Sequence, residues 1–385
     1  MKKLAIAAVV ALGLPILAAC GGGDSGSGDA IKVAVVLPLT GATAETAEQM
    51  RNAANLALEE INADGGVDGK KLELGFYDDE LTPEGATREA QRAVTRDGVV
   101  AIVGAQSSGE GLAIREVAER SKVPFITSSA TAEAITDGAK YTFRVAPLLT
   151  DYANFVVDFA AERGVKNLAV LHDSGASGQL LKDLFVARAK EIKLSTAGNP
   201  IEFPISATDV TSQVASAGDR KPDAVIIGGA AGADHGLVAR TMFEQGLDVP
   251  LFGFSPILYA DAIDVAGDAY KDLPGVYSVQ NLDEAKPEFK EFAEKYAKEF
   301  GEAKLPEQAA QTYDALHLLA QALEKTGGKG GDKLAEALGG LDPYSGASGK
   351  EGADIDFEPN KHDGFTGDYL VGYQMNGAVA EKVEK

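Results

Sequence analysis

Hydroxyl-bearing residues gather at two places where an apolar segment of the chain ends. Residues 104–109 (GAQSSG) follow the apolar run 99–104, and residues 127–131 (TSSAT) follow the run 124–127. Free backbone N–H groups and hydroxyls at a helix start bind carboxylates, and each such hydrogen bond contributes roughly 1.5–3 kcal/mol. Serine in such places is more often an N-cap or a turn residue. Because two consecutive segment ends carry the same chemistry, we favour a carboxylate-binding site.

The sequence lacks the usual signatures of catalysis and of metal binding. Residues 65–71 (GGVDGKK) have too few residues between their glycines for a phosphate-binding loop and lack its final Ser or Thr. Residues 253–257 (GFSPI) lack the last glycine of a nucleophile elbow. The four histidines are not at metal-ligand spacing, and Pro359 stands where a calcium loop would need glycine. A serine hydrolase using Ser107 or Ser255 is an alternative, but no base is placed nearby, so we predict no enzyme, no metal site and no cofactor.

The hydroxyl-rich segments belong to an alternation of strands and helices. In the first part of the chain the pattern predicts strands at 31–37, 72–77, 99–104 and 124–127, with helices near 50–61, 83–97 and 109–121. The alternation resumes with strands at 167–172, 201–205, 223–227 and 251–254, and helices near 151–163 and 180–191. Two such blocks predict an α/β fold of two doubly wound, Rossmann-like lobes. Ligands of such folds bind beyond the carboxyl ends of the strands.

The C-terminal part departs from this alternation. Helices are expected at 287–300 and 307–325, followed by a strand-rich tail. In the tail we expect strands at 355–357 and 369–374, joined through a turn at Asp363-Gly364.

Composition narrows the class of protein further. The 385 residues, of which 45% are hydrophobic and 24% charged, are enough for two or three soluble domains. With 36 Lys and Arg against 58 Asp and Glu, the net charge of −22 repels phosphate backbones. We therefore expect no nucleic-acid partner. The single cysteine excludes an intrachain disulfide.

The N-terminus has the pattern of an export signal. Two lysines precede an apolar run at 4–17, which is shorter than the roughly 18–20 residues needed to cross a bilayer. Small residues then lead to Cys20. This resembles a bacterial lipoprotein signal, in which 1–19 is removed, Cys20 is acylated and 20–29 forms a flexible tether. The alternative is an ordinary signal peptide in which the cysteine is incidental.

Several segments resemble the leucine/isoleucine/valine-binding protein family, the type I periplasmic binding proteins of ABC importers. The most specific likeness is PLTG at 38–41, EEINADGGVDG at 59–69 and YDD at 77–79. Weaker likenesses continue through 312–315 (TYDA) and 357–360 (FEPN), so the resemblance covers essentially the whole mature chain. It implies two lobes that are joined by three chain crossings and close over a solute.

The resemblance also implies where the lobes divide. The first lobe would comprise 30–147 and 279–342, and the second would comprise 148–278 and 343–385.

Site residues follow from the same resemblance. In the family, the serine corner and the following Ala-to-Thr segment hold the α-carboxylate of the ligand. These roles fall here on Ser107, Ser108, Ser129, Ala130 and Thr131. At other ligand-contacting positions of the family this chain carries smaller residues, which predicts a roomier pocket: Thr46, Ser177, Ala230 and Ser255.

The last of these differences bears on the chemistry of the ligand. Ser255 stands where the family has the acid that pairs with the α-ammonium group of the ligand. A buried ammonium without a counter-charge is strongly unfavourable. Either another acid, such as Asp234 or Asp261, takes this role, or the solute has no amine.

We therefore expect a solute-binding lipoprotein of an ABC importer that captures a small carboxylate, a branched-chain amino acid or a related organic acid. Its expected partners are this ligand, an ABC permease and, through the lipid, the membrane. We expect a monomer, held on the outer face of the cytoplasmic membrane or in the periplasm. The alternatives are a ligand-presenting sensor subunit for a membrane receptor and a binder of an amine-free solute such as an aromatic acid or amide.

Overall fold

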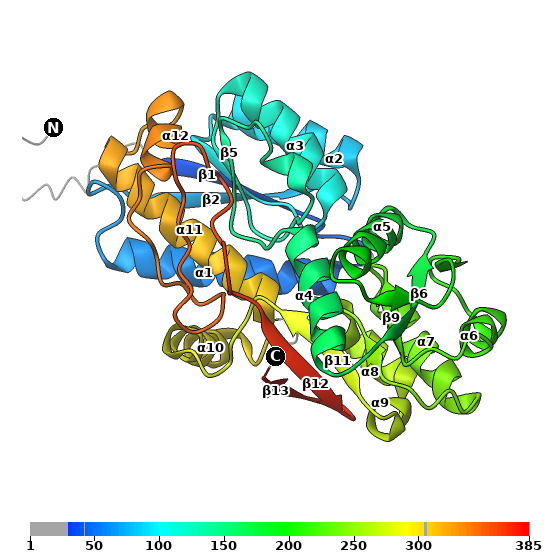
Figure 1. Ribbon diagram of the computed structural model, residues 1–385. Coiled ribbons are helices and arrows are strands. Elements are labelled where there is room, and N and C mark those ends of the chain that lie inside the picture. Colours follow the sequence, from blue (N-terminus) through cyan, green and yellow to red (C-terminus); the bar gives the residue numbers. More distant parts are fainter. Residues whose placement is uncertain (1–29, 42, 304–305, 385) are drawn as a thin grey trace, which may run out of the picture.

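The computed structural model describes residues 30–41, 43–303 and 306–384, which form two α/β lobes (Figure 1). The first lobe is built on a five-stranded parallel sheet with the strand order β2-β1-β3-β4-β5. Its strands are β1 (Ile31–Leu37), β2 (Leu72–Asp78), β3 (Ala101–Gly104), β4 (Phe125–Thr127) and β5 (Thr142–Arg144).

Helices cover both faces of this sheet. Val35 belongs to one hydrophobic cluster and Val36 to another, because successive side chains of a strand point to opposite faces. Helices α1 and α11 supply the first cluster, and α2 and α3 supply the second. This burial on both sides explains the nearly continuous apolar sequence of β1 and β3. The bounds of these helices are α1 (Ala44–Ala63), α2 (Pro83–Arg92), α3 (Ser108–Ser121) and α11 (Pro306–Thr326).

The second lobe contains an eight-stranded sheet with the order β13-β12-β11-β10-β9-β6-β7, in which β8 also pairs with β6. Its pairs are parallel except β11 with β12 and β12 with β13. The strands are β6 (Asn167–Asp173), β7 (Ser195–Thr196), β8 (Ile201–Phe203), β9 (Ala224–Gly228), β10 (Leu251–Phe252), β11 (Val276–Gln280), β12 (Val371–Asn376) and β13 (Val379–Val383). Its helices include α5 (Ala176–Glu191), α6 (Thr211–Gly218), α7 (Gly232–Glu244), α8 (Ala260–Ala266) and α9 (Ala269–Asp272).

The chain passes between the two sheets three times. Strand β5 leads into α4 (Leu149–Glu162) and the second lobe, and β11 leads back through α10 (Pro287–Phe300) into α11. After α12 (Asp332–Leu338), the C-terminal segment returns to the second sheet as β12 and β13. The predicted α/β fold with two doubly wound lobes and three crossings is confirmed.

The segment between α12 and β12 contacts the first lobe along much of its length. Phe357 packs edge-on against Phe143 of β5, with 5.2 Å between ring centroids, and His362 stacks on the same ring at 4.1 Å. Asp363 forms an isolated bridge with Arg144. These contacts differ from the expected assignment of 343–385 to the second lobe, and the boundaries of the lobes stay a prediction.

The expected hairpin around Asp363-Gly364 is wrong. Residues 355–357 form only an isolated bridge, in which Ile355 pairs with Tyr344. Instead β12 pairs with β13 through a two-residue turn, where Gly377 adopts a φ of +61°. Strand β13 (VAEKV) is charged and largely exposed, so no apolar run marked it in the sequence.

Candidate functional site

A cavity of about 130 Å³ lies where the carboxyl ends of β3 and β4 face residues of the second lobe. Its volume is below the roughly 300–1,000 Å³ of pockets for drug-sized ligands, which suits a small solute, and the roomier pocket expected from the smaller residues stays a prediction. The lining residues from β3–α3, β4 and the first crossing are Gln106, Ser107, Ser108, Ser129, Ala130, Thr131, Pro147, Leu149 and Tyr152. The others are Ser177, Ala230, Phe254, Ser255, Pro256, Tyr259, Glu307, Gln308 and Gln311.

Eight of the nine site residues predicted from the sequence line this cavity: Ser107, Ser108, Ser129, Ala130, Thr131, Ser177, Ala230 and Ser255. Thr46 does not line it and lies in the first turn of α1. A threonine side chain extends only one heavy atom beyond Cβ, so its reach from this turn is short. The structure therefore brings together all the predicted positions except this one.

The first hydroxyl corner is a sharp turn from β3 into α3. Gly104 has a φ of +136°, and a Cβ there would collide with the carbonyl oxygen of Val36. Ser107 precedes α3 with extended backbone angles, and its hydroxyl donates to the buried carboxylate of Glu110. The first N–H groups of α3 have no partner within the helix, so they are available at this edge of the cavity. They supply the partial positive charge that attracts an anion.

The second hydroxyl corner is tied to the first. The backbone N–H of Ala132 donates to Ser108 Oγ at 3.2 Å, which joins the segment after β4 to the start of α3. Thr131 lines the cavity, and its carbonyl accepts from the N–H of Leu149 at 3.0 Å. The two corners thus form one continuous surface rather than two separate loops.

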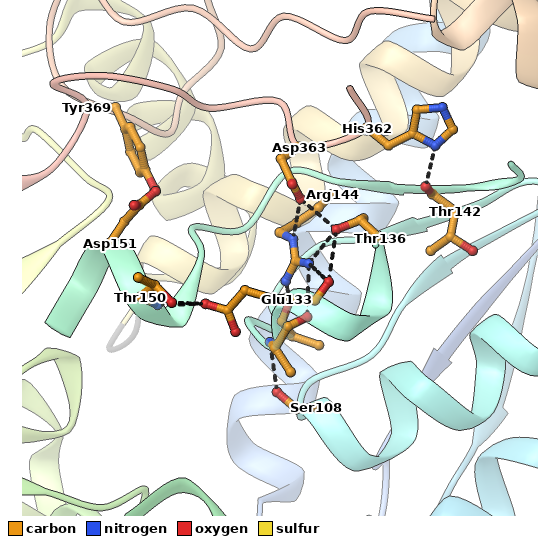
Figure 2. A network of polar contacts seen from close by, with 12 residues as sticks. Ser108, Glu133, Thr136, Thr142, Arg144, Thr150, Asp151, His362, Asp363 and Tyr369 are labelled. Carbon is orange, nitrogen blue, oxygen red and sulfur yellow. Dashed lines mark hydrogen bonds and ion pairs between the residues drawn. The ribbon is translucent and has the colours of Figure 1, made fainter. Parts of the chain in front are cut away.

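Behind this surface lies Arg144, whose side chain is fully buried (Figure 2). Its guanidinium donates to the carbonyls of Ala130 and Ala132 at 3.2 and 2.9 Å. A trans peptide unit directs its C=O and N–H to opposite sides. Because the Ala130 carbonyl faces Arg144, the N–H of Thr131 in the same peptide unit points away from Arg144. The buried arginine therefore orients a backbone donor of the cavity wall.

Glu133 links the same segment to the start of the first crossing. Its carboxylate accepts from the backbone N–H of Thr150 at 2.9 Å and from the hydroxyl of that residue. The next residue of α4, Asp151, accepts from the hydroxyl of Tyr369 at 2.6 Å. Figure 2 shows these contacts beside Arg144. The first crossing is thus bonded both to the cavity wall and to the segment that leads to β12.

A buried carboxylate, Glu307, completes the cavity at the start of α11. Its Oε1 accepts from the hydroxyl of Tyr152 and from the backbone N–H of Asn281 at 2.7 Å. Its Oε2 accepts from the hydroxyl of Ser255 at 2.8 Å. Burial raises the pKa of Glu307, and these three donors lower it again in part.

Glu307 was not among the residues predicted from the sequence. The two alternative acids, Asp234 and Asp261, do not line the cavity. Asp234 accepts from the backbone N–H of Ser206 at 2.9 Å, and Asp261 accepts from that of Ala233 at 3.0 Å.

Four of the other nine missed residues lie in α4 and α11, whose apolar spacing resembles ordinary core packing. Tyr152 lies in α4 and Gln311 in α11, and both side chains are buried. In the sequence, Pro306-Glu307 marks the start of α11. Nothing in the local pattern indicates that this start faces the hydroxyl corners.

Within the part of the chain that the structure describes, no group of three or more His, Cys, Asp or Glu residues is arranged to hold a metal ion. Among the same residues, no helix is long and apolar enough to cross a membrane. The cavity chemistry is therefore that of hydroxyls, amides and one carboxylate.

Comparison with known proteins gives consistent matches over most of the described fold. The profile of a periplasmic binding protein family matches residues 30–376. The leucine-, isoleucine-, valine-, threonine-, and alanine-binding protein of Pseudomonas aeruginosa is 30% identical over 327 residues, covering 80% of this chain and 82% of that protein. Leu/Ile/Val-binding protein homolog 7 of Brucella suis is 28% identical over 356 residues, or 87% of each chain.

Solved structures agree with these matches. The leucine-binding protein LivK of Thermotoga maritima has a TM-score of 0.80 at 24% identity, covering 92% of this chain and 98% of that one. A solute-binding protein of Rhodopseudomonas palustris in complex with 3,4-dihydroxybenzoic acid has a TM-score of 0.75 at 29% identity. The match covers 93% of this chain and 94% of that one. The chain therefore belongs to the leucine/isoleucine/valine-binding family of type I periplasmic binding proteins, which bind solutes for transport and are not enzymes.

Proposed function

We propose that this protein is the solute receptor of an ABC importer and that it holds a small carboxylate between its two lobes. The observation that carries the proposal is the shared cavity of the two hydroxyl corners, 104–109 and 127–131. The helix start and the Arg144-oriented segment direct backbone donors to one place, which suits a carboxylate.

The rest of the cavity suits a compact side chain. Leu149, Phe254 and Pro256 supply apolar surface in the cavity wall, and the volume of about 130 Å³ leaves room for a small molecule. The Pseudomonas relative is named for leucine, isoleucine, valine, threonine and alanine. A branched-chain or other small amino acid is the ligand that we propose first.

A second candidate ligand is an amine-free carboxylate. The Rhodopseudomonas palustris structure at 29% identity contains 3,4-dihydroxybenzoic acid. Ser255, in place of an acid, also removes one possible partner of an ammonium group. The importer role is the same for both candidates, and only the chemistry of the solute differs.

Membership of this family implies a location outside the cytoplasm. We propose in addition that the protein is a monomer anchored by acylation of Cys20, with 1–19 removed and 20–29 as tether. Cys20 and the rest of 1–29 lie outside the described residues. A lipid anchor would keep the receptor close to its permease, and two or more acyl chains suffice for stable attachment.

Thermal shift with a panel of solutes tests the ligand proposal. The panel contains the proteinogenic amino acids, the 2-oxo acids of the branched-chain amino acids, hydroxybenzoates and leucinamide, which has the amine but no carboxylate. A ligand at about 100 times its Kd adds about 2.7 kcal/mol, which raises Tm by roughly 5–10 °C for lobes of this size. We expect such a shift with at least one carboxylate and none with leucinamide. A flat response to every carboxylate would overturn the proposal.

A further inference from the structure

We propose that Glu307 pairs with a cationic nitrogen of the ligand, so that the solute is an α-amino acid rather than an amine-free acid. This inference rests on the proposed function, because it requires a carboxylate ligand in the same cavity. It adds the residue that would decide between the two candidate ligands.

The first argument is the charge of the cavity. Among the described residues that line it, Glu307 is the one acidic side chain, and none is Lys, Arg or His. A simple anion at the hydroxyl corners would place a second negative charge near Glu307, with no cationic side chain in the wall to compensate. A zwitterion presents its carboxylate to the backbone donors and its ammonium to Glu307. The wall is therefore complementary to an amino acid.

The second argument is the hydrogen-bonding capacity of the carboxylate. An ionised carboxylate offers about four acceptor sites, two on each oxygen. Oε1 of Glu307 is occupied twice, by the hydroxyl of Tyr152 and the N–H of Asn281. Oε2 has one donor among the described residues, Ser255 Oγ. One acceptor site therefore remains on Oε2 for a donor from the ligand.

The third argument is how firmly Glu307 is held. Its exposed fraction is only 6%, and its three donors come from α4, from η3 (Ser255–Leu258) and from the end of β11. Tyr152 lies in the first crossing, Ser255 in the second lobe, and Asn281 directly after β11, where the chain leaves the second sheet. A carboxylate fixed from three sides needs no rearrangement to receive an ammonium group, which favours binding.

The first test compares ligands on the unmodified protein by isothermal titration calorimetry. Each amino acid that gives a thermal shift is paired with its own 2-oxo acid and 2-hydroxy acid, which keep the carboxylate and side chain but lack the amine. We expect the amino acid to bind about 10- to 150-fold more tightly, the value of one charge-assisted hydrogen bond. Tighter binding of the amine-free acids, or of hydroxybenzoates, would overturn the role of Glu307 and leave the carboxylate proposal standing.

The second test uses Glu307→Gln, which keeps the shape of the side chain and an acceptor for the N–H of Asn281. We expect it to lose affinity for the amino acid by the same 10- to 150-fold, while its affinity for the amine-free acids stays equal or rises. Gln311→Ala, on the same helix and cavity wall, is the matched control and should weaken both ligand classes alike.

If Glu307→Gln does not fold, Tyr152→Phe and Ser255→Ala each remove one donor while keeping the carboxylate, and both should retain the preference for the amine. Unchanged amino-acid affinity in a folded Glu307→Gln protein would refute the inference. Absence of binding by any carboxylate would instead refute the proposed function.

Discussion

Arg144 Nε donates to Asp363 Oδ1 at 2.7 Å, although the two residues are 219 positions apart in the sequence. The hydroxyl of Thr136 donates to the same carboxylate oxygen at 2.7 Å and accepts from the Arg144 guanidinium at 2.6 Å. The C-terminal segment thus helps to hold the arginine that orients the cavity wall. We infer that the carboxylate-binding segment is ordered before the ligand arrives.

The first prediction concerns this ion pair. Asp363→Ala leaves the buried guanidinium of Arg144 without its counter-charge and should lower the free energy of unfolding by about 3 kcal/mol. The value is at the lower end of the usual range because the Asp363 side chain is 29% exposed. Urea denaturation measures the loss. The affinity for carboxylates should also fall, because the carbonyl of Ala130 loses a fixed partner.

A matched control lies in the same segment. Asp368 pairs with Lys350 at 2.6 Å, but its side chain is 71% exposed. Exposed pairs contribute only about 0–1 kcal/mol. Asp368→Ala should therefore leave unfolding nearly unchanged. Equal losses in the two variants would contradict the structural role assigned to Arg144.

The second prediction concerns the hydroxyl corner itself. Ser107→Ala should weaken a carboxylate ligand about tenfold or more, because it removes a hydroxyl of the corner and the contact with Glu110. Ser177→Ala, on the opposite wall at the start of α5, should change the affinity little. Titration calorimetry gives both affinities, and thermal unfolding without ligand shows whether either variant is destabilised. Equal affinities for wild type and Ser107→Ala would show that the carboxylate binds elsewhere.

Much of this site could be predicted because its main part is local in sequence. Ser107 and Thr131 each follow a buried parallel strand, and parallel neighbours present their carboxyl ends at one edge of a sheet. Consecutive strands are usually neighbours in a sheet, so the proximity of Ser107 and Thr131 follows once β3 and β4 are placed side by side. The strand order and the pairing of β12 with β13 depend on contacts between distant segments and had no local signal.

Glu307 illustrates the opposite case. It reaches the cavity only because the second crossing places the start of α11 against Ser255, which is 52 residues away in the sequence. Strand β5 was missed for a related reason, since Thr142–Arg144 is three residues long and ends in a charge that only tertiary contacts neutralise. Sequence patterns reveal local elements, whereas the pairing of buried charges is set by the assembled fold.

The third prediction concerns pH. Burial raises the pKa of Asp79 from 3.8 to about 7, with Glu110 and Asp78 adding repulsion and the N–H of Leu81 opposing it. The unfolded chain has the ordinary pKa of 3.8 and the folded protein the raised pKa of about 7. Between these values Asp79 keeps its proton in the folded state and has lost it in the unfolded state. The contribution of Asp79 to stability is therefore full below about pH 4 and is lost as the pH rises through about 7.

Asp79→Asn removes this dependence while keeping an oxygen for the N–H of Leu81. We expect the variant to raise Tm relative to wild type at pH 8 and to have little effect at pH 4. Asp209→Asn is the control. The pKa of the exposed Asp209 is lowered from 3.8 in the folded protein, so this carboxyl releases its proton below about pH 4 in the folded and in the unfolded state alike. A difference between Asp79→Asn and wild type that is the same at pH 4 and pH 8 would refute the assignment.

The fourth prediction concerns the membrane anchor. Each buried methylene of an acyl chain contributes about 0.8 kcal/mol, so that one chain attaches a protein only marginally and two or more attach it stably. If Cys20 carries these chains, Cys20→Ser should appear either as soluble protein or as a precursor that keeps residues 1–19. Membrane fractionation followed by mass spectrometry of the N-terminal peptide distinguishes these forms, with Ser25→Ala as the control within the tether. A Cys20→Ser protein that is cleaved after residue 19 and still requires detergent for extraction would show that another part of the chain holds it to the membrane.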